Sequence, residues 1–281
     1  MDGGILYIDK EENMTSREVD NALQRLFHTR RVGHLGTLDP FATGLLIVAI
    51  GEATKCLPFY EDEDKTYVAE LRLGFSTQTG DLTGSVKERK EVPELSKQRI
   101  EEVLSSFLGE YMQVPPMTSA TRIEGKHLYE LAHKGIEIKR EAKKRFIYSL
   151  SLLDFEGEYV RFEAKVSKGT YIRTLGEDIA ASLGTLGHLS SLRRTKIGEI
   201  GLEKAIRLDD VRPDCLKDPY LLLPFRKVLL SKEDSIRARN GVKLCFDYKE
   251  DTLFVCDNEG KAIAIYEREK ERLYRVKRGI A

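Results

Sequence analysis

The sequence predicts an α+β fold, with a mainly antiparallel mixed sheet flanked by helices and a small β-rich module after it. Helix-like and strand-like segments follow one another irregularly, without the repeated strand–helix–strand units of a parallel sheet. Residues 65–73 and 159–166 alternate apolar and polar side chains, as half-buried strands do. A cluster of prolines, Pro213, Pro219 and Pro224, marks a boundary before the final module.

The first fifty residues predict a strand, a helix, a loop and a second strand. Residues 4–8 read as a short strand, and residues 16–28 as a helix with one apolar face. Ser16 is placed to cap that helix. Residues 29–43 are rich in Gly and Arg and predict a loop. Residues 45–50 are uniformly apolar, which is typical of a strand buried on both faces.

The middle of the chain predicts two strands and three helices. In the strand over residues 65–73, Tyr67 shares one side with Ala69, Leu71 and Leu73. The second strand covers residues 159–166. Helices are predicted over residues 96–108, over residues 127–133, and after Thr170, which can cap the last of them.

The segment after the prolines predicts a separate β-rich module. A short helix over residues 235–240 is ended by Gly241. Three strand-like runs follow, with a turn between the last two: residues 242–246, 252–256 and 262–266. A module of this size is near the lower limit for a stable core unless it docks on a larger domain.

Composition excludes several classes of protein. No run of about 18 apolar residues is present, so no membrane span is expected. The N-terminus lacks a basic region followed by an apolar one, so we expect no secretory signal. The four cysteines are far apart and form no C-x-x-C pair, which predicts neither a zinc site nor a disulfide framework. A reducing cytosol is the natural setting, and a cytoplasmic location is expected.

Charge is balanced overall but clustered locally. Forty-six basic residues match forty-six acidic ones, and such a balance argues neither for nor against nucleic acid. Residues 122–145 carry eight Lys or Arg against four Glu, and Arg193, Arg194 and Lys196 form a second cluster. Taken alone, each cluster is as readily a solvated surface as an RNA contact.

Asp39 lies in an unusual loop. Gly33, Gly36 and Gly44 permit close approach of a ligand or unusual backbone angles. Pro40 stiffens the backbone after the carboxylate, and Arg30, Arg31 and His34 lie on the same loop. A single Asp before Pro is ordinarily a turn residue. From the residues alone, a turn and a functional loop suited to an anionic polymer both remain open.

Several motifs resemble, in the same order, those of the bacterial tRNA pseudouridine-55 synthases, the TruB family. The two long ones are GHLGTLDPFATGLL at residues 33–46 and SKGTYIRTL at residues 167–175. The shorter ones are KTY at 65–67, TQTGDLTG at 77–84, QVPP at 113–116 and HLSSLRR at 188–194. The matches span about residues 5–196, and the C-terminal segment resembles a PUA domain, an RNA-binding module.

The resemblance implies two domains and one reaction. Residues 1–224 would form the catalytic domain, with an RNA-gripping insertion at about 113–146, and residues 225–281 a PUA-like RNA-binding domain. The enzyme would isomerise uridine to pseudouridine at position 55 in the T loop of tRNA, by flipping the base out and attacking it with an aspartate. The resemblance implies no guide RNA, metal or organic cofactor. The partner would be the T arm of tRNA, with no membrane, no obligate protein partner and a monomeric enzyme.

The family's catalytic residues map onto three positions of this chain. Asp39 matches the nucleophile, and Arg173 matches the arginine that pairs with it and keeps it ionised. Tyr67 matches the tyrosine that stacks on uracil and is a candidate base for the C5 proton. Without the motifs, Arg173 would read as a surface arginine on a helix, and Tyr67 as a core aromatic.

Other positions match supporting and RNA-binding residues. His34 matches the histidine that inserts into the RNA loop, and Leu192 an apolar wall of the uracil pocket. Asp81 matches a carboxylate behind the catalytic residues, and Lys65 would support the loop or bind a phosphate. The residues alone allow an ordinary loop histidine, core leucine and turn aspartate. The expected RNA-contacting arginines are Arg122, Arg193 and Arg194.

The sequence departs from the family pattern at three positions. Thr118 stands where Tyr is usual, and Arg122 where Lys is usual, so contacts made by the insertion would differ, although Arg122 still suits a phosphate. Ala181 replaces a usual Gly in the helix that bears Arg173, with little expected consequence because alanine suits a helix.

Two competing functions remain beside the stand-alone enzyme. One is a guide-RNA-dependent relative of the dyskerin type, which has other residues around its aspartate and often a Lys-rich tail. The other is a catalytically silent RNA-folding or ribosome-assembly factor, which the basic insertion and the PUA-like tail would suit. The motif around Asp39 and the short C-terminus favour the stand-alone enzyme over the first. The intact set of Asp39, Tyr67 and Arg173 argues against the second.

Overall fold

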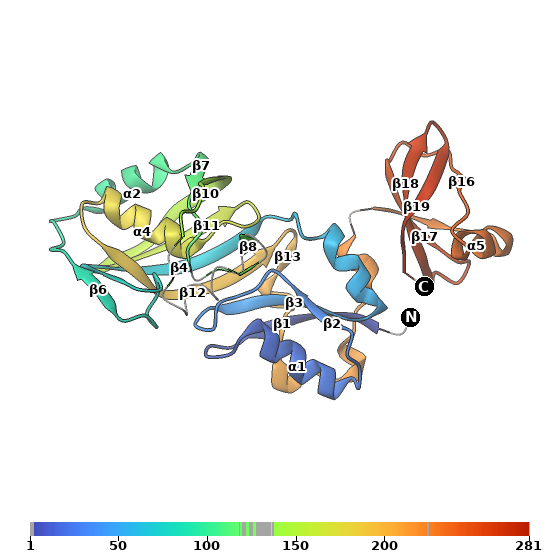
Figure 1. Cartoon of the computed structure of the whole chain (residues 1–281), viewed down its shortest axis with the longest axis horizontal. Coiled ribbons are helices and arrows are strands. Elements are labelled where there is room, and N and C mark those ends of the chain that lie inside the picture. Colours follow the sequence, from blue (N-terminus) through green and yellow to red (C-terminus); the bar gives the residue numbers. More distant parts are fainter. Residues whose placement is uncertain are drawn as a thin grey trace.

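The computed structural model contains two sheets, one large and one small, at the two ends of an elongated molecule (Figure 1). It describes residues 3–117, 119, 122–123, 126–127, 136, 138–223 and 225–280. Among these residues, no helix combines the length and the apolar character needed to cross a membrane.

The larger sheet is mixed and mainly antiparallel, as predicted. Its strands run in the order β14-β1-β3-β12-β4-β11-β10-β7, while β2 pairs with β3 and β13 with β12. Two pairs are parallel, β1 with β14 and β3 with β12. The strands are β1 (Gly3–Lys10), β2 (Val32–Leu35), β3 (Thr43–Gly51), β4 (Lys65–Leu73), β7 (Gly109–Gln113), β10 (Lys143–Glu156), β11 (Tyr159–Val166), β12 (Gly187–Ile197), β13 (Ile200–Gly201) and β14 (Ile206–Arg207).

Two helices cover one face of the sheet beside β4 and β11. Both strands have the predicted bounds, and their apolar side chains are buried in alternation, for example Ala69 and Phe162. The helices are α2 (Lys97–Ser106), capped by Ser96, and α4 (Ile172–Ser182). Their apolar side chains share one core cluster with the inner face of the sheet, which confirms these strand and helix predictions.

The strands β1 and β3 are buried on both faces. Helix α1 (Ser16–Leu26) packs on one face against Leu46 and Val48. The 3₁₀ segment η1 (Glu52–Phe59) packs on the other, against the cluster that holds Leu45 and Ile47. The uniformly apolar run in this part of the sequence therefore reflects burial on two sides, as predicted.

Two predicted helix caps were wrong, and one predicted loop contains a strand. Thr15, not Ser16, caps α1, in a reciprocal capping box with Glu18. Tyr171, not Thr170, is the N-cap residue of α4, because the Thr170 hydroxyl donates to the carbonyl oxygen of Ser167. Strand β2 lies inside the expected loop over residues 29–43, because the edge of β3 offers it backbone partners.

The C-terminal module is β-rich, as predicted, and has more strands than the sequence suggests. Its sheet runs in the order β15-β17-β18-β19-β16, and the predicted strands omitted β15 and β19. Helix α5 begins three residues earlier than expected, after the cap Ser231. The elements are β15 (Arg226–Leu229), α5 (Lys232–Arg239), β16 (Leu244–Cys245), β17 (Thr252–Cys256), β18 (Ala262–Lys270) and β19 (Leu273–Gly279).

The small sheet docks on the larger domain through η1. Cys56 and Phe59 of η1 join Phe254 and Ile265 of the small sheet in one apolar cluster, together with Leu223 from the connecting segment. Docking of this kind supplies the extra burial that a module of this size needs. The connection is made of short 3₁₀ turns: η2 (Leu202–Lys204), η3 (Leu208–Asp210), η4 (Pro213–Cys215) and η5 (Pro219–Leu222).

Two small hairpins complete the described secondary structure. They pair β5 (Phe75–Thr77) with β6 (Val86–Arg89), and β8 (Arg122–Ile123) with β9 (Lys126–His127). The helix expected over residues 127–133 lies almost wholly outside the described residues, and its first residue, His127, belongs to β9.

Candidate active site

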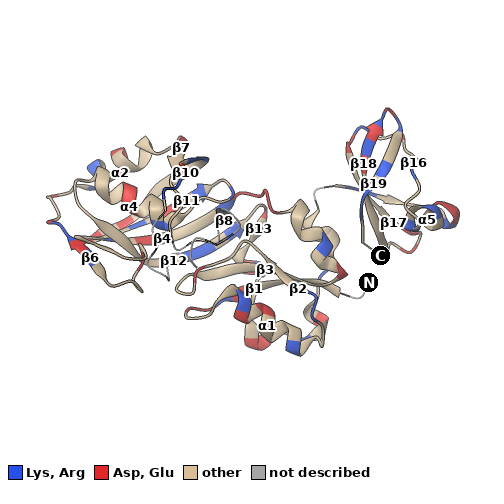
Figure 2. Ribbon diagram, viewed as in Figure 1, with Lys and Arg blue, Asp and Glu red and all other residues tan. Residues whose placement is uncertain are grey.

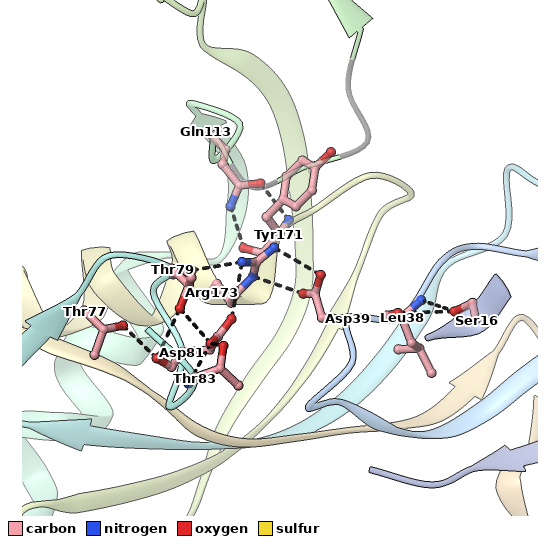
Figure 3. Close-up of polar contacts among 10 residues, drawn as sticks. All are labelled: Ser16, Leu38, Asp39, Thr77, Thr79, Asp81, Thr83, Gln113, Tyr171 and Arg173. Atoms are coloured by element: carbon pink, nitrogen blue, oxygen red, sulfur yellow. Dashed lines mark hydrogen bonds and ion pairs between the residues drawn. The ribbon is translucent and has the colours of Figure 1, made fainter. Parts of the chain in front are cut away.

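The Asp39 carboxylate and the Arg173 guanidinium form a two-point ion pair (Figure 3). Arg173 Nε lies 3.0 Å from Asp39 Oδ2, and Nη2 donates to Oδ1 at 3.2 Å. Asp39 comes from the loop between β2 and β3, and Arg173 from the first turn of α4. The structure therefore brings together two predicted residues that are 134 positions apart in the sequence.

Backbone contacts on both sides of Asp39 fix its loop. Ser16 Oγ donates to the carbonyl oxygen of Leu38 at 3.2 Å and accepts from the Leu38 N–H at 2.9 Å. The carbonyl oxygen of Pro40 accepts from the Asn13 N–H at 2.9 Å and from Lys10 Nζ at 3.3 Å. The β1–α1 segment thus holds the residues immediately before and after the carboxylate.

Glycine is required at the start of β3, where the loop returns to the sheet. Gly44 has a φ of +100°, and a Cβ atom there would lie 2.3 Å from the carbonyl oxygen of Arg194. At this point β3 runs parallel to β12, with Gly44 opposite Arg194. No larger residue could let the two backbones approach so closely, so Gly44 fixes the path by which the loop carrying Asp39 joins the sheet.

Arg173 is clamped on the side away from Asp39. Its Nη1 donates to the carbonyl oxygen of Thr79 at 2.9 Å and lies 3.3 Å from Asp81 Oδ2. The other oxygen of Asp81 accepts from Thr79 Oγ1 at 2.7 Å and from the Thr83 hydroxyl and N–H at 2.5 and 3.0 Å. Asp81 therefore orients Arg173, and the guanidinium presents its remaining edge to Asp39.

Burial and the Arg173 charge have opposite effects on the pKa of Asp39. Burial raises the pKa of Asp39 above its usual range, the Arg173 charge opposes that rise, and Asp81 adds to it. The Asp39 side chain is 34% exposed, whereas that of Arg173 is 5% exposed. The carboxylate is thus the part of the pair that a bound molecule can reach, and Arg173 supports it from within.

Tyr67 and Leu192 lie in the apolar cluster beneath the loop. Tyr67 is 7% exposed and Leu192 6% exposed, and both share a core cluster with Leu38 and Phe41, which flank Asp39. They come from the neighbouring strands β4 and β12, in which Leu192 stands opposite Ala69. The two readings of Tyr67 are compatible here, because a core aromatic also lies next to the catalytic candidates.

His34 lies on β2 and is held from two sides. Its Nδ1 is 2.9 Å from Asp20 Oδ2 of α1, and its Nε2 is 3.3 Å from the Thr37 hydroxyl. Its side chain is 17% exposed. The partners are side chains rather than the neighbouring backbone, so the ring is fixed on the loop that carries Asp39.

The predicted cationic residues separate into exposed and buried ones. Arg193 is 41% exposed and binds Asp9 and Thr43, so it can reach a phosphate. Arg194 is 1% exposed, and its guanidinium donates to the carbonyl oxygens of Leu45 and Gly36 at 2.7 and 2.8 Å. This burial corrects the expectation that Arg194 contacts RNA, since its donors hold the active-site loop instead.

Lys65 is buried and holds the segment before β4. It is 7% exposed and donates to the carbonyl oxygen of Glu63 at 2.6 Å. Burial, together with the nearby Arg194 charge, lowers the pKa of Lys65 to about 8. This burial argues against a phosphate contact, and the hydrogen bonds of Lys65 go to the turn before β4 rather than to the active-site loop. The side chain of Arg122 lies outside the described residues, although its backbone belongs to β8.

Sequence reasoning missed the residues that position the loop. Lys10 and Ser16 touch the backbone beside Asp39, and Gln113 bonds the backbone of Tyr171, two residues before Arg173. A polar residue at the end of a strand or at a helix start is a weak signal, because such positions are usually polar. In the described part of the chain, no group of three or more His, Cys, Asp or Glu is arranged to hold a metal ion.

The arrangement is suited to nucleophilic chemistry. A carboxylate becomes a useful nucleophile when it is ionised, oriented and reachable, and the guanidinium of Arg173 provides the first two conditions. Partial exposure of Asp39 provides the third. Leu38 and Phe41, on either side of Asp39 in the sequence, belong to the same buried apolar cluster as Tyr67 and Leu192.

Two family models match consecutive parts of the chain. Residues 24–172 match the TruB family pseudouridylate synthase N-terminal domain, and residues 173–234 match the tRNA pseudouridylate synthase B C-terminal domain. The first match contains Asp39, Tyr67 and Asp81, and the second begins at Arg173.

Curated relatives are similar over most of their length. A tRNA pseudouridine synthase B of Hydrogenovibrio crunogenus is 43% identical over 96% of this chain and 90% of its own. The enzyme of the same name from Azoarcus is 44% identical over 86% and 83%. That of Clostridium tetani is 38% identical over 86% and 85%.

Solved structures share the fold at lower identity. The crystal structure of a Cbf5-Nop10-Gar1 complex contains a chain with a TM-score of 0.73 and 23% identity, covering 99% of this chain and 85% of that one. An H/ACA RNP bound to a substrate RNA containing 2′-deoxyuridine contains one with a TM-score of 0.70 and 22% identity, covering 100% and 86%. At such identities the likeness shows a common fold alone.

Proposed function

The chain belongs to the TruB family of pseudouridylate synthases, and from this we propose that it isomerises uridine to pseudouridine at position 55 in the T loop of tRNA. The observation that carries the proposal is the two-point pair of Arg173 with a partly exposed Asp39. This geometry gives the family's reaction an ionised, oriented carboxylate at the position that the motif predicts.

The reaction begins when the target uridine leaves the stack of the T loop. A base inside a folded loop cannot reach a carboxylate, so the nucleotide is flipped into the site. Asp39 then forms a covalent bond either to the ribose C1′, as the C1′–N1 bond breaks, or to C6 of the base. In the first route, C5 of the turned uracil bonds to C1′ and displaces the Asp39 carboxylate. In the second, the C1′–N1 bond breaks, the turned uracil bonds to C1′ through C5, and the bond between Asp39 and C6 then breaks as the C5–C6 double bond re-forms. In both routes C5 loses a proton, N1 gains one, and Asp39 is released as a carboxylate.

The neighbouring residues orient Asp39, bind the uracil and remove its proton. Arg173 keeps Asp39 ionised during attack, and Asp81 keeps Arg173 in place. Tyr67 stacks against the uracil, and we assign it as the candidate base for the C5 proton. Leu192 forms an apolar wall of the same pocket, and Arg194 holds the loop through the backbone carbonyl of Gly36.

RNA is bound over a wider surface than the site itself. We assign His34 to insertion in the T loop, and the exposed Arg193 to a phosphate near the site. The insertion at residues 113–146, with Arg122, and a C-terminal domain at residues 225–281 add further contacts. Lys and Arg residues lie on α5 and β19 of that domain, beside Asp and Glu residues (Figure 2). These contacts need no guide RNA, because the protein itself grips the T arm.

The test is isomerisation by the purified chain alone. A T-arm stem-loop is incubated with the protein, without guide RNA or other protein, and pseudouridine is mapped at every uridine. We expect conversion at position 55 only. Conversion that requires an added guide RNA would favour a dyskerin-type enzyme. Accelerated folding of tRNA without any pseudouridine would favour a pure RNA-folding factor. Mapping total cellular tRNA with and without the protein extends the test to all substrates.

A further inference from the structure

Gln113, the last residue of β7, fastens that strand to the beginning of α4. Its amide Nε2 donates to the carbonyl oxygen of Tyr171 at 2.9 Å, and its Oε1 accepts from the Tyr171 N–H at 2.8 Å (Figure 3). Gln113 is 1% exposed, so neither group exchanges readily with water. One side-chain amide therefore satisfies both backbone groups of a single residue.

That residue is where α4 starts. Tyr171 is the N-cap of the helix, and its side chain makes no capping hydrogen bond. The neighbouring Thr170 hydroxyl donates to the carbonyl oxygen of Ser167 instead. The first N–H groups of a helix have no partner within it, and a local side chain usually fixes them. Here the side chain of Gln113, on strand β7, binds the backbone of the N-cap residue instead.

Arg173 lies two residues beyond this contact, in the first turn of α4. The contacts with Thr79 and Asp81 hold the tip of its side chain, but the position of its backbone depends on where the helix begins. We infer that Gln113 is a positioning residue for Arg173 and, through Arg173, for the Asp39 carboxylate. This inference rests on the proposed function, since it assigns Gln113 a part in the same reaction.

The same two elements share a second contact that serves as a matched control. The Tyr111 hydroxyl, also on β7, donates to Asp178, a residue further along α4 than Arg173, and accepts from Gln113 Nε2 at 3.4 Å. Tyr111→Phe removes these two contacts and loosens the packing of β7 on α4, but it leaves both hydrogen bonds between Gln113 and Tyr171 at the helix start. Any effect of Gln113 on the reaction that merely reflects this packing would therefore appear in the Tyr111→Phe variant too.

Gln113→Met keeps the length of the side chain and removes both hydrogen bonds. We expect the single-turnover rate of pseudouridine formation to fall by up to about 100-fold, the scale of a misplaced catalytic group. Affinity for the T-arm stem-loop should not change, because Gln113 is buried. The acid limb of the rate should move to higher pH, because a displaced Arg173 lowers the pKa of Asp39 less.

The experiment compares Gln113→Met, Gln113→Asn and Tyr111→Phe with the parent chain across pH, at a temperature where circular dichroism shows all of them folded. Gln113→Asn retains the amide but is too short to reach both groups of Tyr171, and it carries the test if the Met variant does not fold. We expect the acid limb of the pH–rate profile to lie at higher pH in both Gln113 variants. In Tyr111→Phe it should lie at the same pH as in the parent chain. Gln113 variants with the parental limb would overturn the inference. A parent chain without activity would instead contradict the proposed function.

Discussion

At the scale of residues, the proposed reactive group is the Asp39 carboxylate, which is partly exposed and paired with Arg173. Burial alone would favour the protonated, unreactive form of Asp39. The Arg173 guanidinium, bound through two of its nitrogens, counters this while leaving the carboxylate accessible. Asp81 has the complementary task of holding Arg173, and its four oxygen contacts with Thr79, Thr83 and Arg173 leave it little freedom.

Replacing Arg173 by Gln should move the acid limb of activity to higher pH. Attack requires ionised Asp39, so activity is lost as pH falls through the pKa of that group. Because burial already raises this pKa and Arg173 lowers it, removal of the arginine raises it further. The measurement is the single-turnover rate as a function of pH. An acid limb at the same or lower pH in Arg173→Gln would contradict this electrostatic role.

Tyr67→Phe should separate stacking from proton removal. The ring and its burial are retained, so RNA affinity and folding should be close to those of the parent. If the hydroxyl takes the C5 proton, the overall rate should fall by at least about 100-fold, the lower range for loss of a general base. Release of tritium from C5-labelled RNA measures this step. Release at the parental rate would assign Tyr67 to stacking alone.

The candidate residues and one of their supports, Asp81, could be named from the sequence, but supports such as Lys10 and Gln113 could not. Asp39, Tyr67 and Arg173 stand in recognisable motifs. Arg194 stands in such a motif as well, yet its buried guanidinium donates to two backbone carbonyl groups and does not face the RNA-binding surface expected from the motif. Whether an arginine faces inward depends on the register of β12 against its neighbours, which no local pattern reveals.

At the scale of elements, the β1–α1 segment and the active-site loop form one unit. Ser16 begins α1 and also bonds both backbone groups of Leu38, the residue before Asp39. Thr15 caps the same helix, and its hydroxyl bonds with Glu18. The Thr15 hydroxyl therefore stabilises the start of the helix, whereas the Ser16 hydroxyl stabilises the active-site loop.

Substituting each hydroxyl by Ala should separate these tasks. Thr15→Ala should lower the free energy of unfolding by about 1 kcal/mol, the usual value of a cap, and leave the rate of pseudouridine formation unchanged. Ser16→Ala leaves the buried N–H of Leu38 unpaired, and it should slow the reaction about tenfold at temperatures where the protein is folded. Denaturant unfolding and single-turnover rates check the pair. Equal rates for both variants would contradict the task assigned to Ser16.

Elements with a regular pattern were predictable, and those made by tertiary contact were not. The strands β4 and β11 have the predicted bounds because alternation follows directly from one buried face. Strand β2 was missed because its backbone bonds depend on β3 rather than on its own Gly-rich sequence. The start of α4 was misplaced by one residue because Gln113, from a distant strand, fixes it.

At the scale of the whole molecule, a neutral chain must bind an anion through local patches. The sum of charges is zero, and Lys and Arg residues on β18 and β19 of the C-terminal sheet, far from α4, are paired with Asp and Glu residues (Figures 1 and 2). That sheet is joined to η1 by a shared apolar cluster rather than by a flexible tether. We propose that this sheet contacts parts of tRNA outside the T loop.

Replacing Arg272 and Lys277 by Met should weaken binding of full-length tRNA more than binding of the isolated T-arm stem-loop. Their side chains are 68% and 44% exposed, on β19 and the turn before it. For every side chain that no longer binds a phosphate, the slope of log affinity against log salt should fall by about 1. Titrations at several salt concentrations measure this slope. An equal loss of affinity for both RNAs would place the C-terminal contacts within the T arm.

The most direct measurement compares the parent chain with Asp39→Asn and Asp81→Asn on a T-arm stem-loop whose only uridine is at position 55. Asparagine keeps the size of each side chain and removes its charge. We predict pseudouridine from the parent, none from Asp39→Asn despite retained RNA binding, and a reduced rate from Asp81→Asn, which only positions Arg173. Pseudouridine formation by Asp39→Asn at the parental rate would contradict the assignment of Asp39 as nucleophile.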